Sequence, residues 1–353
     1  MTSSADAGAI GVGLVGYGLA GAVLHAPVIE VIDDYRIVAV ASSRAEAGER
    51  RDRPQVVADI DALLAIKAVE LVVVVTPNDL HATHAEAALR AGKHVVVDKP
   101  MAPTVADCDR LIDCARETGR VLSVYHNRRW DGDYLAARTL LADGMIGTPA
   151  LYEARWDRFR PEAASVWRNA PRAGAGLLWD LGPHLVDQAI GLFGWPDAMT
   201  ADVAAQRLGA QADDYFELTL HYGTGRAILS ASTLVAATRP HMALHGTAGS
   251  WWTEALDPLE AALRAGRSPA EPLPAILALR ATKDGERLSH AVRAGDPFAF
   301  YRQLAAAIRS GSAPPVDPIE ARDVVALIEA AHSGTPLPEP RGPRRLPVVC
   351  QHG

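Results

Sequence analysis

Short apolar runs alternate with amphipathic stretches through the first 125 residues. The runs are rich in β-branched residues and apolar on both faces, which is typical of parallel strands covered by helices on each side. The stretches between them repeat their apolar residues at helical spacing, most clearly in Leu80–Ala91 and Thr104–Thr118. The predicted strands are Ile10–Val15, Ile37–Ala41, Leu71–Val75, Val95–Asp98 and Val121–Val124. This alternation predicts a doubly wound α/β sheet.

The pattern changes after about Tyr125, where longer runs follow one another without a helix between each pair. The segment His221–Gly225 suits a hairpin turn between two of these runs. The predicted strands are Leu151–Trp156, Ala201–Arg207, Tyr215–His221 and Arg226–Thr233, and the predicted final helices are Phe300–Arg309 and Pro318–Ala331. Residues 257–296 show no pattern that assigns a structure. We therefore expect two domains, residues 1–125 with an α/β fold and residues 126–353 with an α+β fold around a mostly antiparallel sheet.

Length, charge and cysteine content narrow the class of protein. The 353 residues fit about two domains, and the net charge of −7 gives no general attraction to nucleic acid or to an anionic membrane. Three cysteines without CxxC spacing favour neither a disulfide framework nor a structural zinc site. The apolar run Ile10–Leu24 follows a segment without Lys or Arg and is too short to span a bilayer. We expect a cytoplasmic protein.

The first predicted strand leads directly into the sequence Gly16-Tyr17-Gly18-Leu19-Ala20-Gly21. A GxGxxG motif is weak by itself, but a preceding strand and a following helix give it the context of a dinucleotide-binding turn. In that turn the first glycine permits the tight bend, the second lets the backbone approach a pyrophosphate, and the third allows close packing of helix and strand. The alternative is a glycine-rich turn without a ligand.

The end of the second strand bears on the choice between NAD and NADP. NAD-binding sites usually have Asp or Glu there for the ribose hydroxyls, whereas this strand ends in Ser42, Ser43 and Arg44. Small hydroxyls followed by a guanidinium suit a 2′-phosphate, so NADP is favoured. Arg44 can equally be a solvated charge, and Glu46 keeps NAD possible.

Two more strand ends carry polar residues, at Thr76-Pro77-Asn78 and at Asp98-Lys99-Pro100. Ligands of open parallel sheets bind at the carboxyl ends of the strands. A lysine directly after a buried strand is unusual because its charge is costly to desolvate. Pro100 disfavours helical geometry at Lys99, so the lysine can extend toward a ligand. A surface lysine is the alternative interpretation.

A second group lies in Asp180-Leu181-Gly182-Pro183-His184. Asp180 at or near an N-cap, with Pro183 in the first turn, predicts a helix start. His184 then lies one turn further on the same face, and a carboxylate beside an imidazole is suited to proton transfer. The alternative is a capping Asp with a core His. No HExxH or similar motif accompanies the pair, so we expect no metal.

Other hydrogen-bonding residues have open interpretations. The segment Tyr125–Trp130 follows the last strand of the first domain and offers many donors for a polyhydroxylated ligand, or serves as a structural hinge. An Arg–Trp mixture further along forms either a sugar-binding wall or an interface. Its members are Trp156, Arg158, Arg160, Trp167 and Arg168. Nucleic acid would stack on such residues too, but the acidic balance argues against it.

Taken together, these motifs resemble the Gfo/Idh/MocA family of oxidoreductases. The matching segments are Gly16–Gly21, Thr76–Asn78, Ala91–Val95, Asp98–Pro100 and Asp180…His184, in the family's order. Within the family, His25–Pro27, Tyr125–Asp131 and Arg158–Pro161 look like the branch of NADP-dependent scyllo-inositol dehydrogenases. The resemblance covers nearly the whole chain and is weakest at residues 257–296. Asp98 stands where many members have Glu.

The resemblance implies a Rossmann domain followed by an α+β domain with an open sheet, whose exposed face makes a homodimer or homotetramer. It implies that Lys99, Asp180 and His184 are catalytic, with a Lys–Pro bond that is frequently cis. The implied cofactor-binding residues are Gly16, Tyr17, Gly18, Leu19, Ala20, Gly21, Ser42, Ser43, Arg44, Thr76, Pro77, Asn78, His81, Asp98, Lys99, Pro100, Asn127 and Arg129. The implied substrate-binding residues are Lys99, Tyr125, Asn127, Arg158, Trp167, Asp180, His184 and Tyr301.

The implied activity is hydride transfer between NAD(P) and a hydroxyl carbon of a sugar or cyclic polyol, with scyllo-inositol as the leading substrate. His184 removes the hydroxyl proton, Lys99 stabilises the developing alkoxide, and Asp180 orients the site. Two alternatives stay open, another sugar or keto-sugar oxidoreductase of the same family and a non-catalytic NAD(P)-sensing regulator. Retention of all three catalytic residues favours an enzyme over a sensor.

Overall fold

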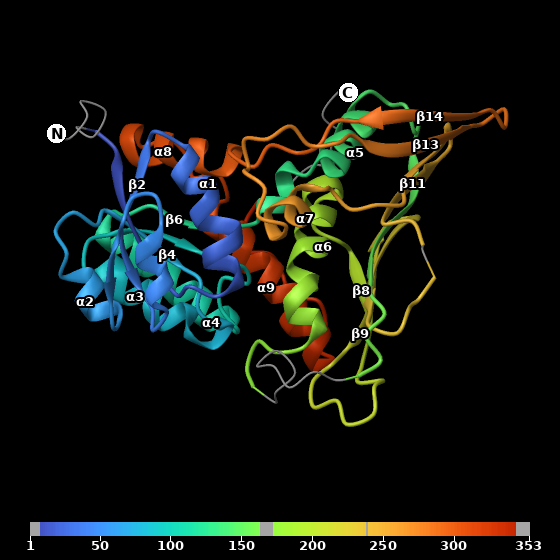
Figure 1. Cartoon of the computed structure of the whole chain (residues 1–353). Helices are drawn as coiled ribbons and strands as arrows, with labels where there is room; N and C mark the ends of the chain where they lie inside the picture. The colour runs from blue at the N-terminus through green and yellow to red at the C-terminus, as the bar shows by residue number, and fades with distance from the viewer. Residues whose placement is uncertain (1–7, 163–171, 238, 344–353) are drawn as a thin grey trace. The chain divides into compact units, whose positions relative to one another are not determined.

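The chain forms two compact units in a computed structural model that describes residues 8–162, 172–237 and 239–343. The first unit contains Met1–Tyr125, Leu259–Pro272 and Pro297–Arg322, and the second contains His126–Pro258, Leu273–Asp296 and Asp323–Gly353. A break falls after Tyr125, where the sequence pattern changes, but two later segments return to the first unit. Figure 1 shows one of them, helix α8 (Ala299–Ser310), beside the early elements of that unit.

A parallel sheet of six strands forms the centre of the first unit, in the order β3-β2-β1-β4-β5-β6. The strands are β1 (Ile10–Val15), β2 (Tyr35–Ala41), β3 (Gln55–Val57), β4 (Leu71–Val74), β5 (His94–Val97) and β6 (Leu122–Val124). This is the strand order of a dinucleotide-binding Rossmann sheet, which confirms the predicted doubly wound fold. The sequence pattern missed only the short edge strand β3, because two of its three residues are exposed.

Helices connect these strands. They are a π-helix η1 (Ala20–His25) that continues into α1 (Ala26–Val31), the 3₁₀ turns η2 (Ala45–Glu49) and η3 (Asn78–Leu80), and α2 (Ile60–Leu64), α3 (His81–Arg90) and α4 (Val105–Thr118). A helix from later in the chain, α7 (Leu259–Arg264), packs against η1 in the same unit. Helix α4 shows why the sequence folds this way locally. The Thr104 hydroxyl accepts the Asp107 N–H at its start, and Gly119 adopts a left-handed conformation at its end.

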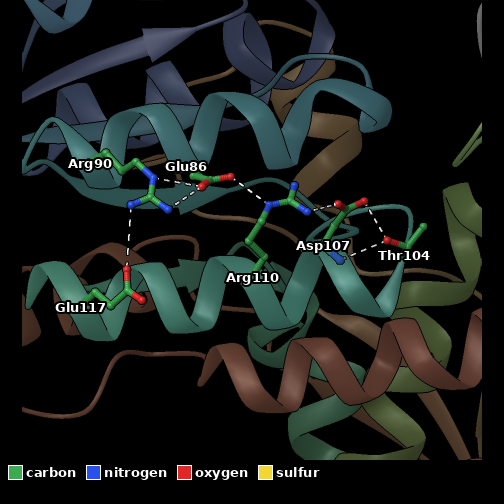
Figure 2. Close-up of polar contacts among 6 residues, drawn as sticks. All are labelled: Glu86, Arg90, Thr104, Asp107, Arg110 and Glu117. Carbon is green, nitrogen blue, oxygen red and sulfur yellow. Dashed lines mark hydrogen bonds and ion pairs between the residues drawn. The ribbon is translucent and has the colours of Figure 1, made fainter.

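Ion pairs join α3 to α4 along their exposed sides (Figure 2). Glu86 of α3 accepts hydrogen bonds from Arg90 on its own helix and from Arg110 on α4. Arg110 in turn reaches Asp107, whose other oxygen accepts the Thr104 hydroxyl. Exposed pairs of this kind add only about 0–1 kcal/mol each, so the network supports the packing of the two helices rather than determining it.

An eight-stranded sheet forms the second unit, in the order β14-β13-β12-β11-β7-β10-β9-β8. The strands are β7 (Pro149–Asp157), β8 (Ala198–Ala204), β9 (Tyr215–Tyr222), β10 (Gly225–Ser232), β11 (Met242–Gly246), β12 (Gly249–Thr253), β13 (Ile276–Thr282) and β14 (Arg287–Val292). Only β7 and β10 pair in parallel among these strands, so the predicted, mostly antiparallel sheet is confirmed.

The helices of the second unit are η4 (Asn127–Trp130), α5 (Gly132–Ala142) and α6 (Leu177–Phe193). Most of α9 (Pro318–Ser333) also belongs to this unit. Helix α6 packs against β7, β9 and β10, and its core-facing side is almost wholly buried. The two predicted C-terminal helices are confirmed by α8 and α9. No helix in the described ranges combines the length and apolar character that a membrane crossing requires.

Candidate functional site

The glycine turn after β1 has the backbone geometry of a dinucleotide-binding loop. Gly16 has a φ of +101°, and a Cβ there would lie 2.8 Å from the Val75 carbonyl oxygen. A Cβ on Gly21 would lie 2.7 Å from the Gly16 carbonyl oxygen. At Gly18 a Cβ would meet nothing within 4 Å. The first and third glycines are therefore required by packing within the protein, whereas Gly18 leaves room for a phosphate group to approach the backbone.

The end of β2 presents a charged, accessible side chain. The Arg44 N–H donates to the Ser42 hydroxyl at 3.1 Å, which fixes the start of the loop. The Arg44 guanidinium lies 3.8 Å from Glu46, with 59% and 58% of the two side chains exposed. A pair this exposed and this long is weak. Arg44 is therefore available to an anionic group, and Glu46 is near enough to compete for it.

The loop after β4 is held by two histidines of α3. The His81 ring is buried, and its nitrogens lie 2.8 Å from the Pro100 carbonyl oxygen and 2.9 Å from the Thr76 carbonyl oxygen. The Thr76 hydroxyl meets His84 Nδ1 at 3.3 Å. Asn78 is also buried. Because both His81 nitrogens face backbone carbonyls, this ring holds the loops in place and has no nitrogen left for a cofactor.

Lys99 lies directly after β5, in a segment with defined backbone geometry. The Asp98 carboxylate accepts the Lys99 N–H at 2.8 Å, and the Lys99–Pro100 peptide bond is cis, as the family resemblance implies. Because β2, β1, β4 and β5 are neighbours in one parallel sheet, their carboxyl ends share one edge. The structure thus brings four predicted segments of the first unit together, Gly16–Gly21, Ser42–Arg44, Thr76–Asn78 and Asp98–Pro100.

Asp180 and His184 lie on α6 of the second unit, and here the structure corrects the predicted helix start. The helix begins at Leu177, so Asp180 is in its first turn and is not the N-cap. Asp213 caps this end instead, because its side chain accepts the Leu178 N–H at 2.7 Å. Asp180 and His184 still lie four residues apart on one helix, so they share a face. His184 is buried, whereas Asp180 is half-buried.

Trp156 of β7 forms a wall beside His184. The centres of the two rings are 5.8 Å apart with a tilt of 33°. The Arg128 guanidinium stacks 4.2 Å from the indole centre and is held by Asp131 at 2.8 Å. Arg158 lies 5.7 Å from the same ring and 3.9 Å from the Asp180 carboxylate. The predicted residues Arg158, Asp180 and His184 are therefore neighbours, while the supporting role of Arg128 was not predicted.

Arg129 was predicted to bind the cofactor, but the structure gives its guanidinium another partner. Its Nε and Nη2 donate to the two oxygens of Asp187 at 2.8 and 2.6 Å. Only 3% of the Asp187 side chain is exposed, so this is a bidentate interior ion pair. His126 lies 4.0 Å from the same carboxylate, and the neighbouring Asn127 is half-buried. The placement favours a structural role for Arg129.

Tyr125 and Tyr301 were predicted to bind substrate, and the structure places both inside the first unit. The Tyr301 hydroxyl lies 2.6 Å from His25 Nδ1, and the Tyr35 hydroxyl donates to the Tyr301 carbonyl. Tyr125 packs against the rings of His25, Phe300 and Tyr301. Both tyrosines are almost fully buried in this aromatic cluster, which argues against direct contact with a substrate. The predicted residue Trp167 lies outside the described residues.

Within the part of the chain that the structure describes, no group of three or more His, Cys, Asp or Glu side chains is placed to hold a metal ion. Burial lowers the pKa values of His81 and His84 from their ordinary value. Near neutral pH these two rings are therefore mostly uncharged. The residues of the first unit fit a dinucleotide. They provide an open glycine backbone, an accessible Arg and a Lys along one edge of the sheet.

Comparisons with known proteins agree with this geometry. Residues 10–126 match the oxidoreductase family with an NAD-binding Rossmann fold, and residues 134–252 match the Gfo/Idh/MocA C-terminal domain. The chain is 40% identical over 332 residues to the NADP-dependent scyllo-inositol 2-dehydrogenase IolW of Bacillus subtilis, covering 91% of this chain and 92% of IolW. It is 41% identical over 328 residues to the uncharacterized Escherichia coli oxidoreductase YdgJ, covering 91% and 94%. The solved structure of Bacillus subtilis YvaA superposes with a TM-score of 0.87 at 38% identity, covering 94% and 98%.

Proposed function

This chain belongs to the Gfo/Idh/MocA family of NAD(P)-dependent oxidoreductases, and we propose that it is an NADP-dependent dehydrogenase of a cyclic polyol, with scyllo-inositol as its substrate. The main support for this substrate is the 40% identity to a scyllo-inositol 2-dehydrogenase along 91% of the chain. The local geometry of each unit supports the chemistry. The proposed catalytic residues are Lys99, Asp180 and His184.

The dinucleotide would be held by the first unit. Its pyrophosphate would bind the backbone N–H groups around Gly18, where even an added Cβ would meet no atom of the protein within 4 Å. Arg44 and the hydroxyls of Ser42 and Ser43 would bind the 2′-phosphate that distinguishes NADP from NAD. The half-exposed Arg44 guanidinium supports this preference, because only a weak pair with Glu46 must be broken.

When bound, the oxidised nicotinamide ring would supply the redox chemistry, because its C4 atom accepts a hydride from the substrate carbon. The protein handles the proton. His184 takes the proton of the substrate hydroxyl as the C–H bond breaks, and the hydroxyl carbon becomes a carbonyl. The Lys99 ammonium stabilises the negative charge that develops on the oxygen. Asp180, one turn before His184 and beside Arg158 at 3.9 Å, orients the group that takes the proton.

A substrate panel with both cofactors tests this function. We expect reduction of NADP, monitored by nicotinamide absorbance, with scyllo-inositol as the best substrate among inositols, hexoses and pentoses. Their keto forms are tested in the opposite direction, for oxidation of NADPH. A better hexose or keto-sugar would identify a different oxidoreductase of the same family. Tight NADP binding without turnover of any compound would indicate a cofactor-sensing protein and would refute the proposed activity.

Variants test the assigned residues. His184→Asn and Lys99→Met should each lower kcat by about 100-fold or more, while the Kd for NADP changes far less with His184→Asn. Matched controls are His221→Asn on β9 and the exposed Lys67→Met, which should behave like the wild type. For cofactor choice, Arg44→Ala should weaken the binding of NADP more than the binding of NAD. Arg36→Ala, at an exposed position of the preceding strand β2, should change neither affinity. Near-normal turnover in both catalytic variants would remove the assignment.

A further inference from the structure

His81 joins two segments that are far apart along the chain but adjacent in the sheet. It is the first residue of α3, and 1% of it is exposed. Its Nδ1 lies 2.8 Å from the carbonyl oxygen of Pro100, and its Nε2 lies 2.9 Å from the carbonyl oxygen of Thr76. Thr76 follows β4 and Pro100 follows β5, and these two strands are neighbours. One ring therefore bridges the two strand ends.

We propose that His81 is a positioning residue, which ties the Thr76 backbone to the Pro100 backbone and so fixes the segment that carries Lys99. The cofactor part of this proposal rests on the proposed function, since it takes both segments to contact the dinucleotide. The tie itself is a property of the protein without ligand. It assigns His81 an action through the backbone, in place of direct contact with the cofactor.

The chemistry of the bridge makes it sensitive to protonation. Both partners are carbonyl oxygens, which only accept hydrogen bonds, and a neutral imidazole carries a single N–H. The neutral ring therefore satisfies one carbonyl and turns a lone pair toward the other. Only the imidazolium donates to both. Each tautomer of the neutral ring ties a different segment, and the complete bridge forms when the ring gains a second proton.

Burial and the charged groups around the ring determine the pH at which His81 takes up that second proton. Burial is the largest influence and lowers the pKa of His81, and the Lys99 charge lowers it further. The two carbonyls and the Asp98 carboxylate act in the opposite direction. His84, one turn along α3, has its own pKa lowered by burial and by the neighbouring His81. The bridge is therefore incomplete at neutral pH and becomes complete as the pH falls below the ordinary His value of about 6.5.

This arrangement links cofactor binding to proton uptake. If the dinucleotide needs both segments in their bridged positions, it binds the protonated form more tightly, and by linkage its binding favours protonation of His81. The affinity for NADP should therefore rise as the pH falls through the region below neutrality. The effect should disappear when the ring is removed.

The test compares His81 with a histidine outside this site. His81→Leu removes both contacts, His81→Gln keeps one amide donor, and His221→Ala is the control, because His221 lies on β9 of the second unit. Titrations of NADP at several pH values should give about tenfold weaker binding for His81→Leu, a smaller loss for His81→Gln, and less than about a twofold change for His221→Ala. The rise in affinity at low pH should persist only in the wild type and in the control.

Nitrogen NMR of the cofactor-free wild type provides the second readout, because the ring shifts distinguish imidazolium from either neutral tautomer. Titration of His81 should move the amide signals of Thr76 and Met101 with the same midpoint. A ring that stays neutral across the range with these amides unmoved would overturn the proposal, even if His81→Leu failed to fold. Unchanged NADP affinity and pH dependence in folded His81→Leu would overturn it as well. If the wild type bound neither NADP nor NAD, the proposed function would fall, and the NMR titration would still decide whether the tie exists.

Discussion

Replacing Arg129 by methionine separates two interpretations of this side chain. The family resemblance implied that Arg129 binds the cofactor, whereas the structure shows its guanidinium donating to both oxygens of Asp187 at 2.8 and 2.6 Å. The Asp187 side chain is 3% exposed and that of Arg129 is 17% exposed. Arg129→Met therefore removes the bidentate cation from a carboxylate that water hardly reaches. The loss should appear as reduced stability rather than as reduced cofactor affinity.

The expected size follows from this burial. Removing one partner of a buried ion pair costs about 3–5 kcal/mol, because a charge stays buried without its counterion. The exposure of the site places Arg129→Met at about 3 kcal/mol, the lower end of that range. Water reaches the Arg129 side of the pair, where 17% of the side chain is exposed. At about 2–4 °C per kcal/mol for a unit of this size, the Tm should fall by roughly 6–12 °C.

A double-mutant cycle provides the assay. Thermal unfolding would be followed by circular dichroism for the wild type, Arg129→Met, Asp187→Leu and the double variant. The double variant should recover most of the lost stability, since apolar residues of similar volume often replace a buried pair without cost. Below the transition, the Kd for NADP should stay within about twofold of the wild type. An unchanged Tm together with a large loss of NADP affinity would refute this reasoning and restore Arg129 to the cofactor site.

Three further outcomes are expected. Gly16→Ala places a methyl group at a φ of +101° and against backbone atoms, so it should abolish NADP binding measured by calorimetry, and normal affinity would contradict the required turn. Burial raises the pKa of Asp131 to about 8, so its stabilising contribution is present below the ordinary value near 4 and is lost as the pH rises toward 8. The Tm of the wild type should consequently fall more than that of Asp131→Asn between about pH 6 and about pH 9. An equal fall of Tm with pH in both proteins would contradict the raised pKa of Asp131. Hydrogen bonds from Arg90 and Arg110 lower the pKa of Glu86, so the stability they add is present above the ordinary carboxyl pKa and is lost in acid. Glu86→Gln should cost less than about 1 kcal/mol in urea unfolding at neutral pH and nothing in acid, and a pH-independent cost would exclude the ion pairs.

The fold was predictable wherever burial gave the sequence a simple pattern. Strands β1 and β4 are buried along their whole length, so they appear as unbroken apolar runs. Strands β11, β12, β13 and β14 were missed. Strand β14 offers no such pattern, because five of its six residues are exposed, and β11 and β12 are only five residues long. The return of residues 259–272 and 297–322 to the first unit was also beyond prediction. Nothing local in those segments says which sheet they will cover.

The candidate site divides in the same way. The roles of Gly16 and Gly21 follow from backbone geometry close by in sequence, and the structure agrees with the motif. The cap of α6 comes from Asp213, 35 positions beyond Leu178, the residue whose N–H it accepts, so the helix begins earlier than a cap at or near Asp180 predicted. The partner of Arg129 lies 58 residues away. Sequence spacing shows which groups could take part in chemistry, whereas distant partners decide which of them are already engaged.

His25 shows how far the branch resemblance reaches. The motif His25–Pro27 suggested a particular substrate branch, yet the His25 ring is fully buried and contacts the Tyr301 hydroxyl at 2.6 Å. Burial lowers the pKa of His25 to about 4 and raises that of Tyr301, so a neutral ring and a protonated tyrosine hydroxyl share this hydrogen bond. These residues join helix α8 to the N-terminal part of the first unit. Their similarity to a known branch therefore reflects a shared core, and it supports the family more strongly than it supports the substrate.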